Sequence, residues 1–506
     1  MPKYNFYYDE SEHSRKINYT TISASNYYDN FITMIVGWST RNDDILQLHA
    51  DFETKYADRQ NCNGEIKSTM LRQKQFKYGF ASLNRQNAQF IYDFLSLFNK
   101  DIHIYFSISS KIEYLVLQLF QNYRNNLLID ADLMKYSIIK ALVMYHPQEI
   151  IKCIFESPKD FLAELKKFFQ NRIEYNKGNP ILKQKETEAF QQILFILNDI
   201  SDSPDINWDY HMSFDGFKKY LGEKDISNYH LTIDKEGEEN EQSKTLKAAC
   251  EIGLYNSSEA NSIELPGLRM ADMLAGIISK LMKGLFDSLR YQSLDDSTNK
   301  KLLEPDWFYL NELQLNIYKK LYCLICEWQP AWYKSYSGIY SDDLVLFNAL
   351  LNFMNHFESI EQIQENINMQ GEYFNAFACE QLENYFKLRK CKLPIEPVIP
   401  FDKESYLTPR GGRIFFNSRK QPLLPLYKAS QTFNVLSVGV DQNLTPTVTI
   451  LSGYKTECFQ LPTELSKWAR IVIGMASMGV NLFPAKVTFS NIKGKYYEIY
   501  FSVGNN

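Results

Sequence analysis

The chain has 506 residues, of which 45% are hydrophobic and 23% charged, and a formal net charge of -5 at neutral pH. This length predicts roughly two to four domains with a large core, and the composition is typical of soluble globular proteins. The slight negative charge argues against a protein coated in nucleic acid, which would carry a large positive field, but does not exclude a nuclease, whose metal-binding carboxylates add negative charge.

We expect a cytoplasmic protein without membrane contact. No apolar run approaches the roughly 18 to 20 residues that a membrane helix requires, and the N-terminal residues lack the apolar core of a signal peptide. The eight cysteines are scattered, which fits a reducing compartment. The one Cys-x-x-Cys pair, Cys323 and Cys326, lies in an apolar helical pattern, so we interpret it as a buried structural pair rather than a zinc site.

The first predicted element is a strand over residues 4–11, an aromatic run that ends in the adjacent carboxylates Asp9 and Glu10. An acid at the end of a covered strand lies beside the core and needs a partner or a cation. Because adjacent strand residues point to opposite faces, only one of the two acids can face a metal, and Asp9 is the stronger candidate. The alternative is that Asp9 only caps the following turn.

Apolar periodicity predicts four more elements before residue 110, namely a strand at 31–38, a helix at 43–56, a helix at 87–98 and a strand at 102–108. A turn at 61–64 delivers Glu65. Lys67 lies on the same side as Glu65 if this stretch is extended, where it could contact a scissile phosphate. An ordinary surface lysine is an equally good interpretation.

Residues 111–200 show helical spacing almost throughout, which predicts a helical insertion between strands of the sheet. The insertion could form a lid beside a cleft, but our default interpretation is that it enlarges the core. Residues 229–234 then predict a strand that, like the first, ends in an acid, Asp234. The acidic run after Asp234 is expected to be a solvated loop, and residues 256–261 are expected to be a loop as well.

The next predicted element is an apolar helix over residues 265–280, opened by a Pro-Gly pair and carrying Asp272 near its start. Asp272, Gly276 and Ser279 share one stripe of this helix, and the small residues after the acid would let the first strand approach. The alternative for Asp272 is that it only complements the helix dipole.

Three short motifs bring these acids together, namely Asp9-Glu10-Ser11, Glu65-Ile66-Lys67-Ser68 and Ala271-Asp272-Met273-Leu274-Ala275-Gly276. In order and rough spacing they resemble the bacterial and phage family called domain of unknown function 3800, which is regarded as RNase H-like. Two positions depart from that family's pattern, since Glu12 replaces a Gly and Arg269 replaces a Gln. The resemblance covers residues 1–290 and implies a setting in mobile elements or antiphage defence.

The resemblance implies a sheet whose strand ends and one helix gather three or four acids. Asp9 is then the bridging ligand of Mg2+ or Mn2+, completed by Glu65, Asp234 and Asp272, with Glu10 as a weaker candidate. Two such ions, roughly 3.5 to 4 Å apart, activate water and offset charge on the attacking and leaving oxygens of a phosphodiester. The four acids and Lys67 are thus the expected catalytic residues of a metal-dependent nuclease acting on RNA or DNA.

The fold class that we expect is α/β, with an RNase H-like mixed sheet flanked by helices in residues 1–290 and the helical insertion at 111–200. A helical region at 295–392 follows, and then an α+β domain at 393–506 with strands at 433–440, 446–451, 485–489 and 496–503 and a helix at 463–478. A protein partner would bind through residues 295–506.

The predicted nucleic-acid contacts are Arg269, beside the acids, and Lys390, Arg410 and Arg413 in the most basic window of the chain. The alternative for Arg269 is that it neutralises an acid that holds no metal. A solvated linker is the main alternative for this window. The competing function is a non-catalytic RNase H-like scaffold that binds a partner protein or nucleic acid. Other chemistries have less support, because the sequence has no Gly-rich phosphate loop, His-Glu-x-x-His or Gly-x-Ser-x-Gly motif.

Overall fold

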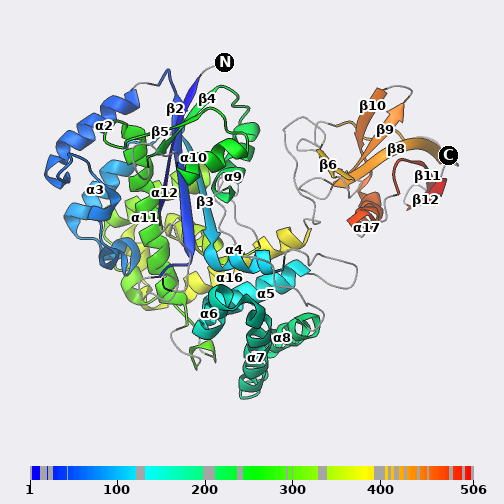
Figure 1. The fold of residues 1–506 in the computed structure, drawn as a ribbon, viewed down its shortest axis with the longest axis horizontal. Coiled ribbons are helices and arrows are strands. Elements are labelled where there is room, and N and C mark those ends of the chain that lie inside the picture. Colours follow the sequence, from blue (N-terminus) through cyan, green and yellow to red (C-terminus); the bar gives the residue numbers. More distant parts are fainter. Residues whose placement is uncertain are drawn as a thin grey trace. The chain divides into compact units, whose positions relative to one another are not determined.

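The computed structural model describes residues 3–11, 20, 27–42, 44–120, 131–197, 211–235, 243–291, 295–298, 300–328, 339–391, 405–407, 412–414, 421–426, 430–440, 445–452, 455–477, 482–492 and 496–502. The chain divides into two compact units, one built mainly from residues before 384 and one mainly from residues after it (Figure 1). No helix of the described residues is both long and apolar enough to cross a membrane.

The first unit is organised around a mixed five-stranded sheet of order β3-β2-β1-β4-β5. Its strands are β1 (Tyr4–Ser11), β2 (Asn30–Ser39), β3 (His103–Ser110), β4 (Tyr229–Asp234) and β5 (Ser257–Ala260). β2 is antiparallel to its neighbours β1 and β3, whereas β4 is parallel to both β1 and β5. β1 is therefore central, and its carboxyl end lies beside that of β4.

Residue composition explains which strands the sequence predicts. β2 is a continuous apolar run and is buried along its length except at the last residue, as expected for a strand covered on both faces. The four strands predicted for this part of the chain are present. The prediction of a loop at 256–261 is wrong, because β5 pairs with β4 through its backbone although its residues, Ser-Ser-Glu-Ala, show no apolar alternation.

Helices cover the two faces of the sheet. α11 (Pro266–Leu289) packs along β1 and β2, and α9 (Met212–Glu223) lies on the opposite face. The Tyr8 ring meets Phe214 of α9 with ring centroids 4.9 Å apart. Tyr7 points the other way, toward Gly267 of α11, where a Cβ atom would lie 2.2 Å from the Tyr7 ring.

Gly276, one stripe residue of α11, has a different neighbour from the one expected. A Cβ atom at Gly276 would lie 2.3 Å from Ser68 Cβ, so this glycine admits the segment after Glu65. For Gly276, the expectation that a small residue after Asp272 admits the first strand is therefore wrong. The first strand approaches α11 one residue after its start, at Gly267.

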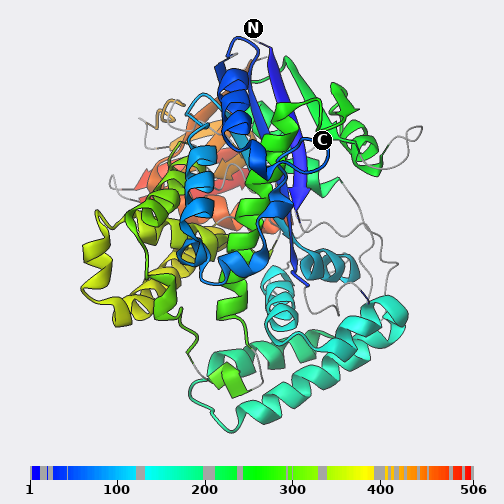
Figure 2. The same cartoon turned by 90° about the vertical axis from the view of Figure 1, so that its left-hand side faces the viewer.

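The remaining helices of the first unit form two groups. The insertion consists of α4 (Lys111–Leu119), α5 (Ala131–Tyr145), α6 (Gln148–Glu156), α7 (Pro158–Asn176) and α8 (Gln184–Leu197). Figures 1 and 2 show α7 beside α8 as a helical hairpin. The other group is α2 (Asp44–Lys55), α3 (Arg85–Leu95), α10 (Lys244–Glu251), α12 (Glu312–Tyr322), α14 (Asp342–Asn355), α15 (Ile360–Gln364) and α16 (Gln370–Cys391).

The helical region after residue 295 shares the hydrophobic core of the sheet. One continuous cluster of buried residues runs from Tyr7 and Met34 of the sheet through α11 to Leu350 of α14 and Phe374 of α16. α12 packs against α3 and α14, which joins these helices to the sheet layer. The helices up to residue 383 therefore belong to the first unit.

The second unit is α+β, as the sequence predicts. Its antiparallel sheet has the order β10-β9-β8-β11-β12, with strands β8 (Ser430–Val440), β9 (Pro446–Ser452), β10 (Lys455–Gln460), β11 (Ala485–Ile492) and β12 (Tyr496–Ser502). α17 (Ser466–Ser477) packs on one face, and β6 (Ser405–Leu407) pairs with β7 (Gly412–Ile414). β10 was not predicted, because its Lys-Thr-Glu-Cys-Phe-Gln sequence is mostly polar.

Candidate functional site

Asp9 lies near the carboxyl end of β1, on the face of the sheet that α11 covers. Side chains alternate along a strand, so Asp9 shares the face of Tyr7, while Glu10 shares the face of Tyr8. The Asp9 carboxylate is half-buried, and its Oδ1 accepts a hydrogen bond from the Glu10 N–H at 2.7 Å. The Glu10 carboxylate instead accepts a hydrogen bond from the Tyr8 hydroxyl. The structure thus separates Glu10, a candidate metal ligand, from Asp9 by the thickness of the sheet.

Asp234 ends β4 beside Asp9. The parallel register pairs Tyr8 with Ile233, so the next residue of each strand, Asp9 and Asp234, lies on the same face at the same edge. Asp234 Oδ1 accepts a hydrogen bond from the Ser262 N–H at 3.2 Å. Two strand ends therefore deliver one acid each to the face covered by α11.

Asp272 joins them from the second turn of α11. Both oxygens of its carboxylate are held by Ser68, with the Ser68 N–H donating to Oδ2 at 2.8 Å and the Ser68 hydroxyl donating to Oδ1 at 2.7 Å. The missing side chain at Gly276 gives Ser68 the room for this contact. Asp272 thus fixes the segment after Glu65 onto the helix. The alternative prediction, that Asp272 complements the helix dipole, requires a residue in the first turn, whereas Asp272 lies in the second.

Glu65 and Lys67 reach the site from the turn predicted at residues 61–64. The Asn61 side chain accepts hydrogen bonds from the N–H groups of Asn63 and Glu65, and Gly64 adopts a φ of 77°, so the turn is set by local chemistry. Glu65 is only 5% exposed, and its Oε1 accepts a hydrogen bond from the Ser262 hydroxyl at 2.8 Å. The Lys67 ammonium donates to the same hydroxyl at 2.7 Å.

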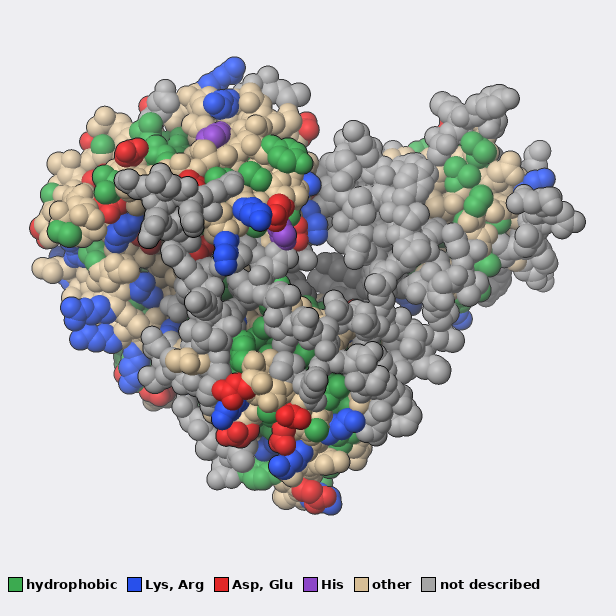
Figure 3. All heavy atoms as spheres, in the orientation of Figure 1, with side chains coloured by type: hydrophobic (Ala, Val, Ile, Leu, Met, Phe, Trp, Pro, Cys, Tyr) green, Lys and Arg blue, Asp and Glu red, His purple; other side chains and the backbone are tan. Residues whose placement is uncertain are grey.

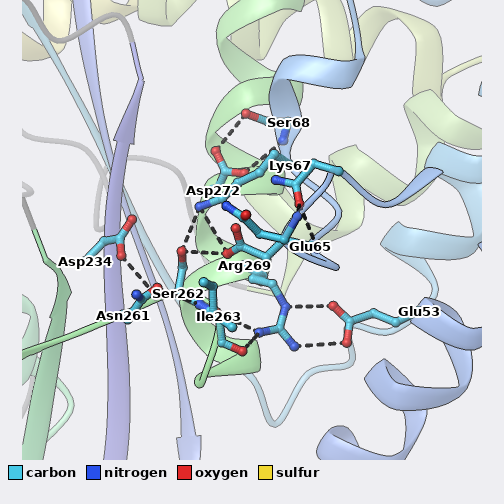
Figure 4. A network of polar contacts seen from close by, with 12 residues as sticks. Glu53, Glu65, Lys67, Ser68, Asp234, Asn261, Ser262, Ile263, Arg269 and Asp272 are labelled. Atoms are coloured by element: carbon cyan, nitrogen blue, oxygen red, sulfur yellow. Dashed lines mark hydrogen bonds and ion pairs between the residues drawn. The ribbon is translucent and has the colours of Figure 1, made fainter. Parts of the chain in front are cut away.

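Arg269 is committed to contacts inside the protein (Figure 4). Its Nε and Nη2 donate to the two oxygens of Glu53 in α2 at 2.7 and 2.9 Å. Its Nη1 donates to the backbone carbonyls of Ser262 and Ile263 at 2.6 and 2.8 Å. Four of the five N–H groups of a guanidinium are thereby occupied. Arg269 was predicted to contact nucleic acid, and the structure places it in an internal clamp between α2, α11 and the turn before α11.

The acids at this edge influence one another electrostatically. Burial raises the pKa of Asp9 well above its ordinary value, and the negative charge of Asp272 raises it further. The charges of Asp234 and Glu10 also raise this pKa, whereas the hydrogen bond from the Glu10 N–H lowers it. Burial also raises the pKa of Asp234, with contributions from Asp272 and Glu65, while Lys67 and the Ser262 N–H oppose the shift. Residues distant in the sequence are therefore electrostatic neighbours in the fold.

The donor set fits a divalent cation in chemistry and in charge. Carboxylate oxygens are the ligands that Mg2+ and Mn2+ prefer, and the four acids face one lysine, which leaves an excess of negative charge. Among the described residues, however, no three His, Cys, Asp or Glu side chains lie close enough together to hold a metal ion. Both oxygens of Asp272 are turned to Ser68, so binding a cation requires this carboxylate to rotate, whereas Ser262 holds Glu65 through Oε1 alone.

Two residues of this site follow from no motif in the sequence. Ser262 lies in a short polar turn, and nothing in its spacing marks it, yet it contacts Glu65, Lys67 and Asp234. Glu53 lies in an ordinary amphipathic helix, and only its contact with Arg269 identifies it. The remaining nucleic-acid candidates stay predictions, because Arg410 and the side chains of Lys390 and Arg413 lie outside the described residues.

Comparison with known proteins adds no relative. No protein-family model, curated protein or solved structure matches the chain.

Proposed function

We propose that the first unit is a metal-dependent nuclease of RNase H-like type, which hydrolyses phosphodiester bonds in RNA or DNA. The observation that carries this proposal is that α11, with Asp272, packs along β1 on the face that Asp9 shares with Tyr7. The two acids come from different elements, yet the charge of Asp272 raises the pKa of Asp9. Such a pair of like charges on half-buried groups is unfavourable unless a proton or a cation offsets it.

The sheet supports the same proposal. Its order β3-β2-β1-β4-β5, with β2 antiparallel to its neighbours, is the arrangement expected of an RNase H-like core. Asp9 lies on the central strand, and the adjacent strand β4 contributes Asp234 at the same edge. Two of the three motifs, those with Glu65 and Asp272, are joined through Ser68, although they lie far apart in the sequence.

Asp9, Glu65, Asp234 and Asp272 would hold the cation, with Glu65 on the side of Ser262. When bound, divalent cations supply a hydroxide nucleophile at neutral pH and offset the charge that develops on the phosphodiester oxygens. The chain contributes the placement of these carboxylates and the ammonium of Lys67, which Ser262 holds among them. Lys67 is suited to donate a hydrogen bond to a phosphate oxygen of the substrate.

On the face of the first unit seen in Figure 3, the described side chains do not form a surface of one charge sign that would attract nucleic acid. Acidic and basic side chains are interspersed there on the described surface. The described residues of this face form no broad basic surface, so the proposal assigns recognition of the substrate to the acidic site, through bound cations and Lys67.

A second candidate function is a non-catalytic scaffold with the same fold. Two observations favour it. Serine donors already form hydrogen bonds with Glu65 and Asp272, and among the described residues no three His, Cys, Asp or Glu side chains lie close enough together to hold a metal ion. In that case the acids serve to dock the segment of residues 65–68 on α11, and binding of a partner or of nucleic acid would not depend on a cation.

A cleavage assay separates the two functions. Labelled single- and double-stranded RNA and DNA are incubated with the full chain in Mg2+, in Mn2+ and in EDTA. The nuclease proposal expects cleavage that EDTA abolishes and that Asp9→Asn and Asp272→Asn reduce by a factor of about 100 or more, since both remove a ligand charge. Glu10→Gln, on the opposite face, is the matched control and should retain cleavage.

The contrary result is equally specific. If wild-type protein binds nucleic acid but cleaves none of these substrates in either metal, and the two Asn variants bind as wild type does, the scaffold is the better description. Circular dichroism spectra of all variants confirm that loss of cleavage is not loss of fold.

A further inference from the structure

Ser262 connects more parts of the acidic site than any of the predicted residues. Its hydroxyl donates to Glu65 Oε1 at 2.8 Å and accepts from Lys67 Nζ at 2.7 Å. Its N–H donates to Asp234, and its carbonyl accepts from Arg269. Ser262, in the turn between β5 and α11, therefore contacts Asp234 at the end of a strand as well as Glu65 and Lys67 in a loop (Figure 4).

The backbone of this turn is itself held in place. Arg269 grips the carbonyls of Ser262 and Ile263, and the Glu53 carboxylate fixes Arg269 in a two-pronged ion pair. The Asn261 side chain accepts a hydrogen bond from the Ile263 N–H at 3.0 Å. Ser262 is 5% exposed, so its hydroxyl is presented to Glu65 and Lys67 from a rigid, buried position.

The distances indicate what the hydroxyl does. The closest approach between Lys67 Nζ and Glu65 is 3.5 Å, which is longer than the roughly 2.7 to 2.9 Å of a direct charge-assisted hydrogen bond. Both groups bond to Ser262 instead, so the hydroxyl lies between the ammonium and the carboxylate. The ammonium and the carboxylate still form an ion pair at this distance, but the hydroxyl takes the place of a direct hydrogen bond between them and leaves the other oxygen of Glu65, Oε2, without a hydrogen bond to any described residue.

We propose that Ser262 is a positioning residue of the metal site, which holds Lys67 apart from Glu65 so that Glu65 stays available to a divalent cation; this assignment rests on the proposed function. Without the hydroxyl, Lys67 closes onto Glu65 and competes with the cation for it. The backbone contacts of Ser262 with Asp234 and Arg269 do not involve the side chain, so a variant at this position changes only the Glu65 and Lys67 contacts.

The experiment is a calorimetric titration of the full chain with Mn2+, without nucleic acid. Ser262→Ala should weaken Mn2+ binding about 10- to 100-fold, the range seen when hydrogen-bonding partners of metal ligands are removed. Ser262→Thr, which keeps the hydroxyl, should stay within about threefold of wild type. Ser258→Ala is the matched control, because the Ser258 hydroxyl on β5 contacts His230 and none of the acids.

A double variant distinguishes positioning from a merely structural role. If Lys67 competes for Glu65, adding Lys67→Met to Ser262→Ala should recover about tenfold or more of the lost affinity, because the competing ammonium is removed. A structural defect would not be repaired by a second truncation. If Ser262→Ala does not fold, as judged by circular dichroism, Ser262→Cys takes its place, since it is similar in size but a weak hydrogen-bond donor.

The outcomes separate this proposal from the proposed function. Mn2+ binding by wild type with an unchanged affinity in Ser262→Ala overturns the role of Ser262 and leaves the nuclease proposal standing. A weakened Ser262→Ala that Lys67→Met does not improve overturns the competition with Lys67. If wild-type protein binds no Mn2+, the proposed function fails, and the role of Ser262 fails with it.

Discussion

Replacing Gly276 by alanine tests whether the segment with Glu65 and Ser68 is seated on α11 as described. A Cβ atom at Gly276 would lie 2.3 Å from Ser68 Cβ and 2.6 Å from Ser68 Oγ, whereas nonbonded carbon atoms pack at about 3.5 to 4.0 Å. Gly276→Ala must therefore push Ser68 away by about 1 Å or more. This displacement breaks at least one of the two hydrogen bonds from Ser68 to Asp272.

The expected loss of stability follows from three contributions. Overpacking of this kind costs about 1 to 3 kcal/mol, and a hydrogen bond to a charged group contributes about 1.5 to 3 kcal/mol. Alanine inside a helix is more favourable than glycine by about 1 kcal/mol, which offsets part of the cost. We expect Gly276→Ala to destabilise the first unit by about 1.5 to 5 kcal/mol.

Urea unfolding followed by circular dichroism measures this difference, together with a Mn2+ titration. Gly284→Ala is the matched control on the same helix, because its Cβ would lie 2.3 Å from the Phe76 carbonyl oxygen, away from the acids. Both variants should lower stability, but only Gly276→Ala, which displaces Ser68 from Asp272, should also change the affinity for Mn2+. A Gly276→Ala protein with the stability and Mn2+ affinity of wild type would refute the seating of Ser68 against Asp272.

Three further predictions concern charge. Burial and the charge of Asp272 raise the pKa of Asp9 in the folded protein, so the contribution of Asp9 to stability is present below its unfolded pKa and is lost as the pH rises. In EDTA, the melting temperature of Asp9→Asn should therefore decline less with pH than that of wild type. An equal decline in both proteins would contradict this. Burial, with help from Asp29 and Asp342, raises the pKa of Asp343 to about 7, so stability should fall between about pH 4 and pH 7, and Asp343→Asn should remove that fall in the same melting series. Arg269→Lys should lower the free energy of unfolding in urea by about 1 to 3 kcal/mol, because lysine cannot form the two-pronged contact with Glu53. The salt dependence of nucleic-acid binding should stay unchanged in this variant, whereas it would change if Arg269 contacted a phosphate directly.

Much of the fold around the site could be predicted from local sequence. The aromatic run of β1 and the apolar run of β2 have the residue types and lengths of covered strands, and the alternation along β1 already assigns Asp9 and Glu10 to opposite faces. Asp234 could be identified in the same way, because an acid at the end of an apolar strand is unusual. These predictions succeed where one short segment carries the whole pattern.

The failures concern contacts that no local pattern encodes. β5 forms because its backbone completes the edge beside β4, which its polar residues do not reveal. Gly276 was linked to the wrong neighbour, because which segment approaches a helical glycine depends on tertiary packing. Ser262 acts through its hydroxyl and backbone in a turn, and the partner of Arg269, Glu53, lies far from it in the sequence and carries no motif.

Crystals soaked in Mn2+ and measured at its absorption edge test the central claim most directly. We expect an anomalous scattering peak between Asp9 and Asp272, with the Asp272 carboxylate turned from Ser68 and Asp234 within ligand distance of about 2.1 to 2.2 Å. A soaked crystal without a peak at these acids, in which Asp272 still binds Ser68 and Lys67 still binds Ser262, would contradict the claim that they form a metal site.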